Sequence, residues 1–522
     1  MVSTIRQFVP FIVLVFAGAV AAAAEERRIV VDFERTSGPF PGTLLTSVGA
    51  GRANEGLRAD WQAQLAELRQ EIDFRYIRMH GLLSDDMGVF KIGREGEVHY
   101  NWQYIDVLYD FILDIGMKPF VELGFMPSGL ASGDQTIFWW RGNVTPPHDY
   151  DRWEDLVYAL VRHLTDRYGE DEVSTWYFEV WNEPNLDGFW TGTQDDYFRL
   201  YRHSANAIKR VSPRYRVGGP ATAGAAWTGE MIRFCVDNDV PIDFISTHDY
   251  GVQQGFLDEF GQTGTVLNAD PRSVVGEVMK VRAIIEQSPL PDLELHFTEW
   301  SSSYTPADPF HDSYQQAPWV LQRLKQIGTA ADSMSFWVFT DIFEEAGPRF
   351  TPFHGGFGLV NLQGIRKPTY YAYAFVSRLS SIELVNRDAS SWVTRNEQGD
   401  VQILFWDSTY TLPEETNNQA WYVKDLPARG KGNVRIRVDN MPPGVYTVTT
   451  YQTGYRVNDP YTQYLDMGAP RQLDRRQVTT LKNDNDGAAR AVETVEVGGG
   501  GAFEISVPLR ENDVFLITLE RR

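Results

Sequence analysis

The chain has 522 residues and a formal net charge of −22, and 43% of its residues are hydrophobic. This length exceeds one ordinary domain and suits a (β/α)8 barrel of ~250 residues or more with a smaller domain beside it. The negative charge argues against nucleic acid and anionic membrane surfaces as partners, because their phosphate groups would be repelled.

The first 24 residues have the pattern of a secretory leader. Arg6 supplies a positive charge, an apolar run follows at 8–20, and Ala21–Ala24 precede the charged Glu25. The run is too short for a comfortable membrane span, although an uncleaved anchor is the alternative. We therefore expect a secreted or periplasmic protein that has no membrane contact once the leader is removed.

From residue 43 onward, strand-like apolar runs alternate with amphipathic helical segments. This alternation indicates a parallel sheet covered by helices, and eight such units make a closed barrel. The eight predicted strands are 43–49, 74–81, 118–124, 176–183, 215–221, 243–250, 293–300 and 334–341.

The helical segments between the strands carry apolar stripes at a period of 3.6 residues. Segment 101–113 follows this pattern, and a further helical segment, 367–379, comes after the eighth predicted strand. The clearest stripe lies in 151–164 and consists of Trp153, Leu156, Val157, Leu160, Val161 and Leu164.

The pattern changes near residue 380 to short strand-like runs separated by turns rich in Gly, Pro and Asn, which predicts a β-sandwich. We expect the catalytic barrel to occupy 40–380 and the sandwich to combine 25–39 with 381–522. The polar stretch 466–500 ends in four glycines and is predicted to form mobile loops. The role of the sandwich and the oligomeric state stay open, and a homo-oligomer is one possibility.

Two glutamates stand at the ends of predicted strands. Glu183 ends the fourth strand, directly after Asn182, and Glu299 ends the seventh. The carboxyl ends of barrel strands form the active-site face, and strands four and seven lie across its mouth from each other. A pair of facing carboxyl groups is what cleavage of a glycosidic bond requires.

Several longer motifs carry a family resemblance: YIRMHGLLSDDMG, FWWRGNVTPPHDYDRW, EVWNEPNL, TEWSSSY and FHGGFGLVNLQGIRKPTYYAYAF. With these motifs the chain resembles glycoside hydrolase family 39 of clan A, which contains β-xylosidases and α-L-iduronidases. The resemblance covers roughly 40–380, and the long runs are most similar to the β-xylosidase branch.

The resemblance implies that Glu183 is the acid/base and that Glu299 is the nucleophile of a retaining mechanism. Physical chemistry agrees with this division. The acid must keep its proton near neutral pH, and a negatively charged nucleophile at ~5 Å helps to raise its pKa. Once the nucleophile is glycosylated its charge is lost, so the same residue can then act as a base.

Other residues at strand ends are expected to surround the sugar. The resemblance places Asn182 at the sugar 2-hydroxyl and Trp337 beneath the sugar ring, and it suggests that Glu344 or its neighbour Glu345 binds hydroxyls. Arg78 and Glu179 lie inside strands and are expected to pair within the barrel, because buried charges need partners. The predicted substrate-binding set is His80, Asn182, His248, Tyr250, Tyr304, Trp337 and Glu344.

The sequence has no metal-binding or dinucleotide-binding motif, so hydrolysis without a cofactor is expected. The favoured activity is a β-D-xylosidase that removes terminal xylose from xylo-oligosaccharides. The alternatives are an α-L-iduronidase, an α-L-arabinosidase or β-galactosidase, a transglycosidase, and a carbohydrate-binding protein without catalysis. Acidic loops argue against an anionic sugar such as iduronate.

Overall fold

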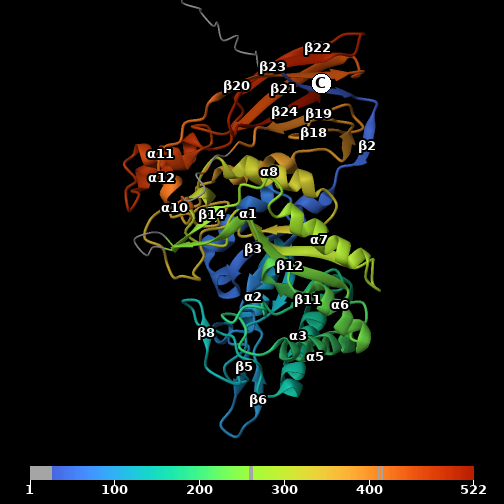
Figure 1. Cartoon of the computed structure of the whole chain (residues 1–522), viewed down its shortest axis with the longest axis vertical. Coiled ribbons are helices and arrows are strands. Elements are labelled where there is room, and N and C mark those ends of the chain that lie inside the picture. Colours follow the sequence, from blue (N-terminus) through green and yellow to red (C-terminus); the bar gives the residue numbers. More distant parts are fainter. Residues whose placement is uncertain (1–25, 258–262, 410–411, 413–415) are drawn as a thin grey trace, which may run out of the picture.

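The computed structural model describes residues 26–257, 263–409, 412 and 416–522, so the predicted leader lies outside the described residues. Figure 1 shows a helix-covered barrel with a stack of β-strands at one end. Within the described residues, no helix is long and apolar enough to cross a membrane.

Eight parallel strands close into a barrel, which confirms the predicted fold class. Each strand pairs with the next one in chain order, and the last pairs with the first. The first predicted strand begins later than expected, because residues 42–45 form a 3-10 turn. The barrel strands are β3 (Ser47–Arg52), β4 (Tyr76–His80), β7 (Lys118–Leu123), β10 (Tyr177–Val180), β11 (Arg216–Thr222), β12 (Phe244–Tyr250), β15 (Glu294–Ser301) and β16 (Ser333–Phe336).

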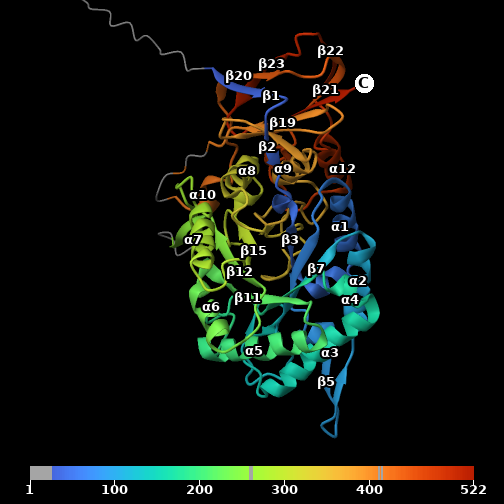
Figure 2. The ribbon, with the colours of Figure 1, turned by 90° about the vertical axis from the view of Figure 1, so that its right-hand side faces the viewer.

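Helices cover the outside of the barrel, as Figure 2 shows. All six apolar residues of the predicted stripe in 151–164 are buried on α3. This helix begins at Asp149, whose carboxylate accepts hydrogen bonds from two backbone N–H groups of the first turn. The covering helices are α1 (Ala59–Glu71), α2 (Gln103–Asp114), α3 (Tyr150–Tyr168), α5 (Gln194–Val211), α6 (Thr228–Asp237), α7 (Val275–Glu286), α8 (Gln316–Ile327) and α9 (Pro368–Ser377).

The barrel interior is built in layers, because every second side chain of a strand points inward. The lowest layer is aromatic and consists of Tyr76, Phe120, Tyr177 and Phe244. Two residues further along the same strands lies a polar layer of Arg78, Glu122, Glu179 and Ser246, all of them buried. The strand period therefore places buried charges directly beneath the mouth of the barrel.

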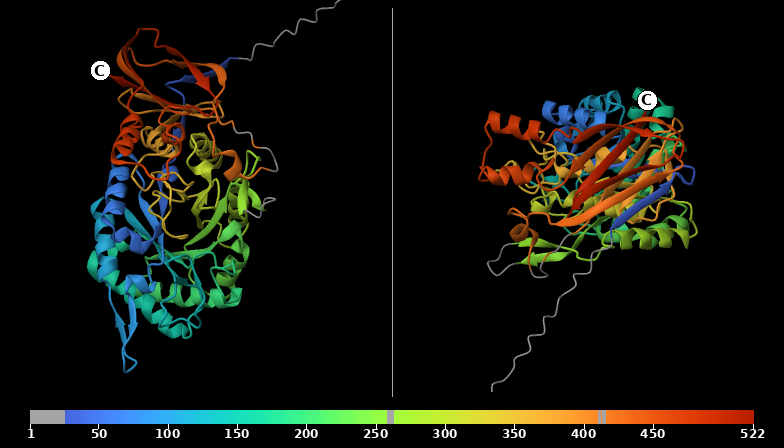
Figure 3. Two further views of the ribbon diagram at one scale, coloured as in Figure 1. Left: turned by 90° about the vertical axis from the view of Figure 1, so that its left-hand side faces the viewer. Right: turned by 90° about the horizontal axis from the view of Figure 1, so that it is seen from above.

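The stack of β-strands consists of two facing sheets around an apolar core that includes Ile29, Ile403, Ile436 and Phe515. Figure 3 shows these sheets lying over one side of the barrel. The small sheet contains β1 (Arg27–Asp32), β20 (Gly430–Asp439) and β23 (Phe503–Arg510). The large sheet contains β2 (Thr36–Pro39), β17 (Ile382–Leu384), β18 (Ser391–Arg395), β19 (Val401–Trp406), β24 (Val514–Arg521), β21 (Gly444–Thr453) and β22 (Ala491–Val497).

The stretch 466–500 differs from the prediction of mobile loops. It contains helix α12 (Arg475–Asp484) and strand β22. Asp474 and Gln477 form a reciprocal capping box that starts the helix, and Leu481 anchors it in a small apolar cluster with Tyr464 of α11 (Pro460–Asp466). The prediction was wrong because a few apolar residues are enough to hold a helix in place when its N-terminus is capped and those residues pack in a cluster.

Candidate active site

A cavity of about 800 Å³ opens at the carboxyl ends of the barrel strands. In a (β/α)8 barrel this face carries the functional site. Its wall is mostly apolar and aromatic, with a few carboxyl groups among the apolar residues. The polar or aromatic residues that line it are His80, Phe138, Asn182, Glu183, Phe189, Asp249, Tyr250, Gln253, Glu299, Tyr304, Trp337, Glu345 and Phe357.

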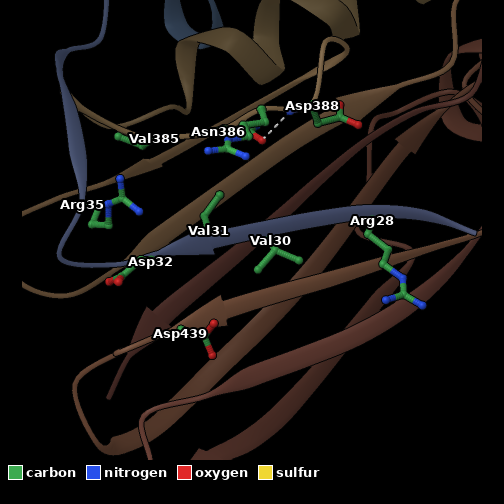
Figure 4. A pocket seen from close by; sticks show the side chains of 10 residues that line it. Arg28, Val30, Val31, Asp32, Arg35, Val385, Asn386, Asp388 and Asp439 are labelled. Carbon is green, nitrogen blue, oxygen red and sulfur yellow. Dashed lines mark hydrogen bonds between the residues drawn. The ribbon is translucent and has the colours of Figure 1, made fainter.

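A second cavity, of about 510 Å³, lies beside strand β1 in the small sheet. Figure 4 shows Arg28 and Arg35 at its two ends, with Val30 and Val31 between them. Three arginines and three aspartates line it, so their charges balance, and Asp388 is already paired with Arg27 at 2.6 Å. This cavity lies away from the carboxyl ends of the barrel strands, and we therefore place the active site in the barrel.

Glu183 lies in the loop after β10, which ends at Val180 and not at residue 183 as predicted. Glu183 has φ +46°, a left-handed conformation that is uncommon for a residue with a side chain and that turns the chain out of the strand. Its backbone N–H donates to the carbonyl of Ala221 on β11 at 2.8 Å. The side chain thereby enters the cavity from a fixed position.

Glu299 reaches the cavity because strand β15 is irregular. The pairing register with β12 shifts between Thr247 and His248, so that His248 lies opposite Glu299. Thr298 still faces the interior, where its hydroxyl donates to Glu179 at 2.7 Å. A bulge of this kind re-aims a side chain, and here it lets two consecutive residues serve the same interior.

Glu183 and Glu299 approach each other closely: carboxylate oxygens of the two residues lie within 4.8 Å. Burial raises the pKa of Glu183 to about 7, although Arg78 opposes the shift. Both oxygens of Glu299 accept strong hydrogen bonds, one from Arg78 at 2.7 Å and the other from the hydroxyl of Tyr250 at 2.8 Å. Glu183 is thus suited to hold a proton, while Glu299 is held in place by two hydrogen-bond donors.

Arg78 is the centre of the polar layer and is completely buried. Its guanidinium contacts Glu179 at 2.5 Å, Glu122 at 2.9 Å and Glu299 at 2.7 Å. Burial lowers the pKa of Arg78, but these three carboxylates outweigh burial and raise it. The expected pairing of Arg78 with Glu179 is therefore present, and it extends to the proposed nucleophile.

Two histidines complete the surroundings of the glutamates. His248 Nδ1 lies 2.9 Å from Glu183 and 3.7 Å from Glu299, and its other ring nitrogen lies 3.2 Å from the hydroxyl of Thr298. Burial lowers the pKa of His248 to about 4 and that of His80 to about 3. Both imidazoles are consequently neutral at physiological pH and act as hydrogen-bonding groups.

The predicted sugar-binding residues, apart from Glu344, are brought together at this site. His248 contacts both glutamates. Arg78 donates a hydrogen bond to the side-chain carbonyl oxygen of Asn182 at 2.9 Å, which leaves the amide nitrogen of Asn182 for a ligand. Tyr304 is half exposed, and the Trp337 ring is buried, with its centroid 4.7 Å from that of the His80 ring. The predicted residues that line the cavity are His80, Asn182, Tyr250, Tyr304 and Trp337.

Comparison with known proteins agrees with this geometry. The family model described as "Glycosyl hydrolases family 39" matches residues 27–500. The chain belongs to this family. It is 39% identical over 481 residues to a β-xylosidase of Geobacillus stearothermophilus, an alignment that covers 91% of this chain and 92% of that protein.

Two solved structures have nearly the same fold. The family 39 enzyme of Xanthomonas axonopodis pv. citri superimposes with a TM-score of 0.94 at 45% identity, covering 97% of this chain and all of that one. A monomeric β-xylosidase of Caulobacter crescentus gives a TM-score of 0.92 at 42% identity, covering 95% and 99%. The family 39 resemblance found in the sequence is thereby confirmed, and the chain is a glycoside hydrolase.

Glu344 is a correction to the predicted site of this family 39 chain. Its carboxylate is bound by Arg52 at 2.7 Å and Arg58 at 3.1 Å, and it does not line the cavity. The next residue, Glu345, lines the cavity instead, 3.6 Å from His80. Burial, together with the charge of Glu299, raises the pKa of Glu345 well above its ordinary value.

Glu122 is a residue of this family 39 site that sequence reasoning missed. Its carboxyl group lies 2.6 Å from Nδ1 of His80, with which it shares a hydrogen bond, and it lies beside Glu179 in the register of β7 and β10. Burial raises the pKa of Glu122 to about 7. The signal was available, because a glutamate in the middle of the apolar run 118–124 needs a buried partner just as Glu179 does.

One possible ligand atom from each of Glu183, His248 and Glu299 lies within 4.8 Å of the others, a spacing that could suit a metal ion. Both oxygens of Glu299 already accept from Arg78 and Tyr250, and each ring nitrogen of His248 already has a partner. A cation would have to displace the Arg78 guanidinium or share an oxygen with it. The hydrogen bonds of this cluster account for its geometry, and its residues do not fit a metal site.

Proposed function

We propose that this chain is a retaining β-D-xylosidase that removes terminal xylose from xylo-oligosaccharides, with Glu183 as acid/base and Glu299 as nucleophile. The observation that carries the proposal is the Glu183–Glu299 pair: two carboxyl groups lie within 4.8 Å, burial favours a proton on Glu183, and Arg78 and Tyr250 donate to Glu299. Retaining glycosidases hold their two carboxyl groups ~5 Å apart, whereas inverting enzymes need room for a water molecule between them.

In the first step a Glu299 oxygen forms a bond to the anomeric carbon while the bond from that carbon to the glycosidic oxygen breaks. Glu183 gives its proton to the departing oxygen, which leaves as a hydroxyl. Tyr250 and Arg78 orient the Glu299 carboxylate for this attack. The Asn182 amide is placed to donate to a sugar hydroxyl beside Glu299, because its carbonyl oxygen is already taken by Arg78.

In the second step water attacks the anomeric carbon, and the bond to Glu299 breaks. Glu183 accepts a proton from the water as it attacks, so both residues return to their starting states. The negative charge of Glu299 is absent in the glycosyl-enzyme, which favours the ionised form of Glu183 that this step needs. His248, neutral and hydrogen-bonded to Glu183, positions that carboxyl group through both steps.

A neutral sugar fits the cavity better than an anionic one. Glu183, Asp249, Glu299 and Glu345 supply carboxyl groups to its wall, and no Arg or Lys is among the described residues that line it. The nearest buried cation, Arg78, is already surrounded by three carboxylates. This charge balance supports a xyloside over an iduronide, and so do the β-xylosidases among the relatives.

The proposal is tested with initial rates on nitrophenyl glycosides: a β-D-xyloside, α-L-arabinosides, a β-D-galactoside and an α-L-iduronide. We expect the β-D-xyloside to have the highest kcat/KM, and NMR spectroscopy of early product to show β-xylose. A dominant rate on another glycoside would refute the substrate assignment. Early α-xylose would refute the retaining mechanism.

The activity is expected to fall as the pH rises through about 7, the pKa to which burial raises Glu183. The acid must be protonated to assist the leaving group, so alkaline solution removes the competent form. The measurement is kcat/KM for the nitrophenyl xyloside from pH 5 to 9. Glu183→Gln should lack this alkaline limb, and a wild-type profile that stays flat to pH 9 would contradict the assignment.

We also propose that the chain is exported to the periplasm or beyond. Arg6, the apolar run 8–20 and Ala21–Ala24 support this, because together they have the order of a leader. Fractionation of cells that express the full chain would check it. Mature protein whose N-terminus follows residue 24, found outside the cytoplasm, is the expected result, and an intact cytoplasmic chain would overturn it.

A further inference from the structure

The active-site cavity is closed on the side of Glu345. The backbone N–H of Trp139 donates to the carbonyl of Glu345 at 2.7 Å, which ties the loop after β7 to the loop after β16. The Trp139 indole lies against Gly347, and the ring of Phe138 stacks on that of His80 with centroids 5.9 Å apart. A sugar chain cannot leave the reacting centre in this direction without separating the two loops.

The opposite side of the cavity adjoins the proposed acid. Glu183 donates its N–H to Ala221, and the Asn185 side chain exchanges two hydrogen bonds with the backbone of Ala223. Ala223 and Gly224 line the cavity there, together with Asp249. Because the glycosidic oxygen must lie beside Glu183 to receive its proton, the leaving sugar extends along this wall.

Asp249 lies on this wall but faces away from the catalytic pair. Its neighbours on strand β12, His248 and Tyr250, both contact the glutamates, so the alternation of the strand turns Asp249 to the outer side, toward Glu277 and Lys280 of α7. Burial raises the pKa of Asp249 to about 7, the repulsion of Glu277 adds to the rise, and the Tyr250 N–H and Lys280 oppose it. In the part of the chain that the structure describes, no side chain hydrogen-bonds to this carboxyl group.

We propose that Asp249 binds hydroxyl groups of the sugar on the leaving-group side and thereby selects oligosaccharides over simple aryl glycosides. This inference rests on the proposed function. A carboxylate can accept from two neighbouring hydroxyls of a sugar ring, and a hydrogen bond to a charged group is stronger than one between neutral groups. A nitrophenyl leaving group has no hydroxyl to offer, so it gains nothing from this residue.

The test compares kcat/KM for xylobiose and for 4-nitrophenyl β-D-xyloside, which form the same xylosyl-enzyme. For Asp249→Ala we expect the ratio of xylobiose to aryl kcat/KM to fall by ~10-fold or more, the equivalent of one lost charge-assisted hydrogen bond. Asp249→Asn should lie between this variant and wild type. Turnover of the aryl substrate also reports that each variant is folded.

Glu277→Gln is the matched control, because it removes a neighbouring carboxylate that does not line the cavity. Its substrate ratio should not fall below that of the wild type, because removing the Glu277 charge lowers the pKa of Asp249 and so favours the ionised form that accepts hydrogen bonds. Equal losses on both substrates in Asp249→Ala, or no loss, would overturn the inference. If the wild type hydrolyses neither xyloside, the proposed function fails instead. The same ratio is then measured with the aryl glycoside and disaccharide of the sugar that it does release.

Discussion

Replacing Glu299 with alanine is expected to lower kcat for the nitrophenyl xyloside by on the order of 10⁴-fold or more, because the covalent route is lost entirely. The small cavity left by the side chain admits an external nucleophile. Azide should therefore restore turnover and give the α-xylosyl azide, whose configuration is inverted. The measurements are the residual rate and the anomeric configuration of the azide product by NMR spectroscopy.

Two further variants serve as comparisons for Glu299→Ala. In Glu183→Ala, azide should yield the β-xylosyl azide, because it replaces water in the second step and Glu299 still acts in the first. Glu344→Ala should lose less than ~10-fold, since the Glu344 carboxylate pairs with Arg52 and Arg58 outside the cavity. If Glu299→Ala stayed active, or gave the β-azide, the nucleophile would have to be assigned elsewhere.

Removing the Arg78 guanidinium is expected to have the largest effect on stability. Arg78→Met leaves Glu122, Glu179 and Glu299 buried around a neutral side chain, and a broken buried ion pair costs about 3–5 kcal/mol. Urea denaturation followed by circular dichroism measures this loss. Arg78→Lys keeps the positive charge but loses the forked donors of the guanidinium. Its free energy of unfolding should lie between those of the wild type and Arg78→Met.

The loss should depend on pH with a definite sign. Glu122 already has a folded-state pKa of about 7, above its ordinary value, and removal of the nearby cation would raise it further. The folded variant then binds more protons than the unfolded chain, so its stability falls as the pH rises from about 4.5 through 7 and above. The deficit relative to wild type should thus be smaller at pH 5 than at pH 8.

Arg167→Met is a suitable control for Arg78→Met, because Arg167 of α3 forms an ion pair with Asp110 of α2 at the protein surface. Exposed ion pairs of this kind are worth about 0–1 kcal/mol. A similar loss of stability in both variants, or a deficit for Arg78→Met that did not change with pH, would show that the buried charge cluster is not what holds this layer together.

The barrel could be predicted from the sequence because each strand and helix carries its own period. The stripe of α3 and the apolar runs of the strands are local signals, and Glu183 and Glu299 stand at strand ends where the fold puts chemistry. Glu122 was missed although it had the same signal as Glu179. The sequence of one strand can predict that a glutamate is buried. It does not identify the partner of that glutamate, which lies on another strand.

The directions of the Glu344 and Glu345 side chains could not be predicted from the sequence pattern. Both follow β16 in an irregular loop, where no strand or helix period fixes the direction of a side chain. Arg52 and Arg58, which form ion pairs with Glu344, come from a segment nearly 300 positions earlier, so only the folded chain brings them together. The bulge in β15 is similar, since the pattern of residues 293–300 does not reveal that Thr298 and Glu299 face the same interior.

The position of β1 and β2 has a consequence for how the chain folds during synthesis. Arg27 pairs with Val434, and Pro39 pairs with Ile382, so the first strands made have no partner until most of the chain has been made. At ~5–20 residues per second this delay lasts for tens of seconds, during which Ile29 and Val31 stay without their apolar core. Strand β24, which ends at Arg521, lies inside the large sheet between β19 and β21. A chain that lacks β24 leaves unpaired edges on both β19 and β21, so the large sheet is complete only after this strand has been made.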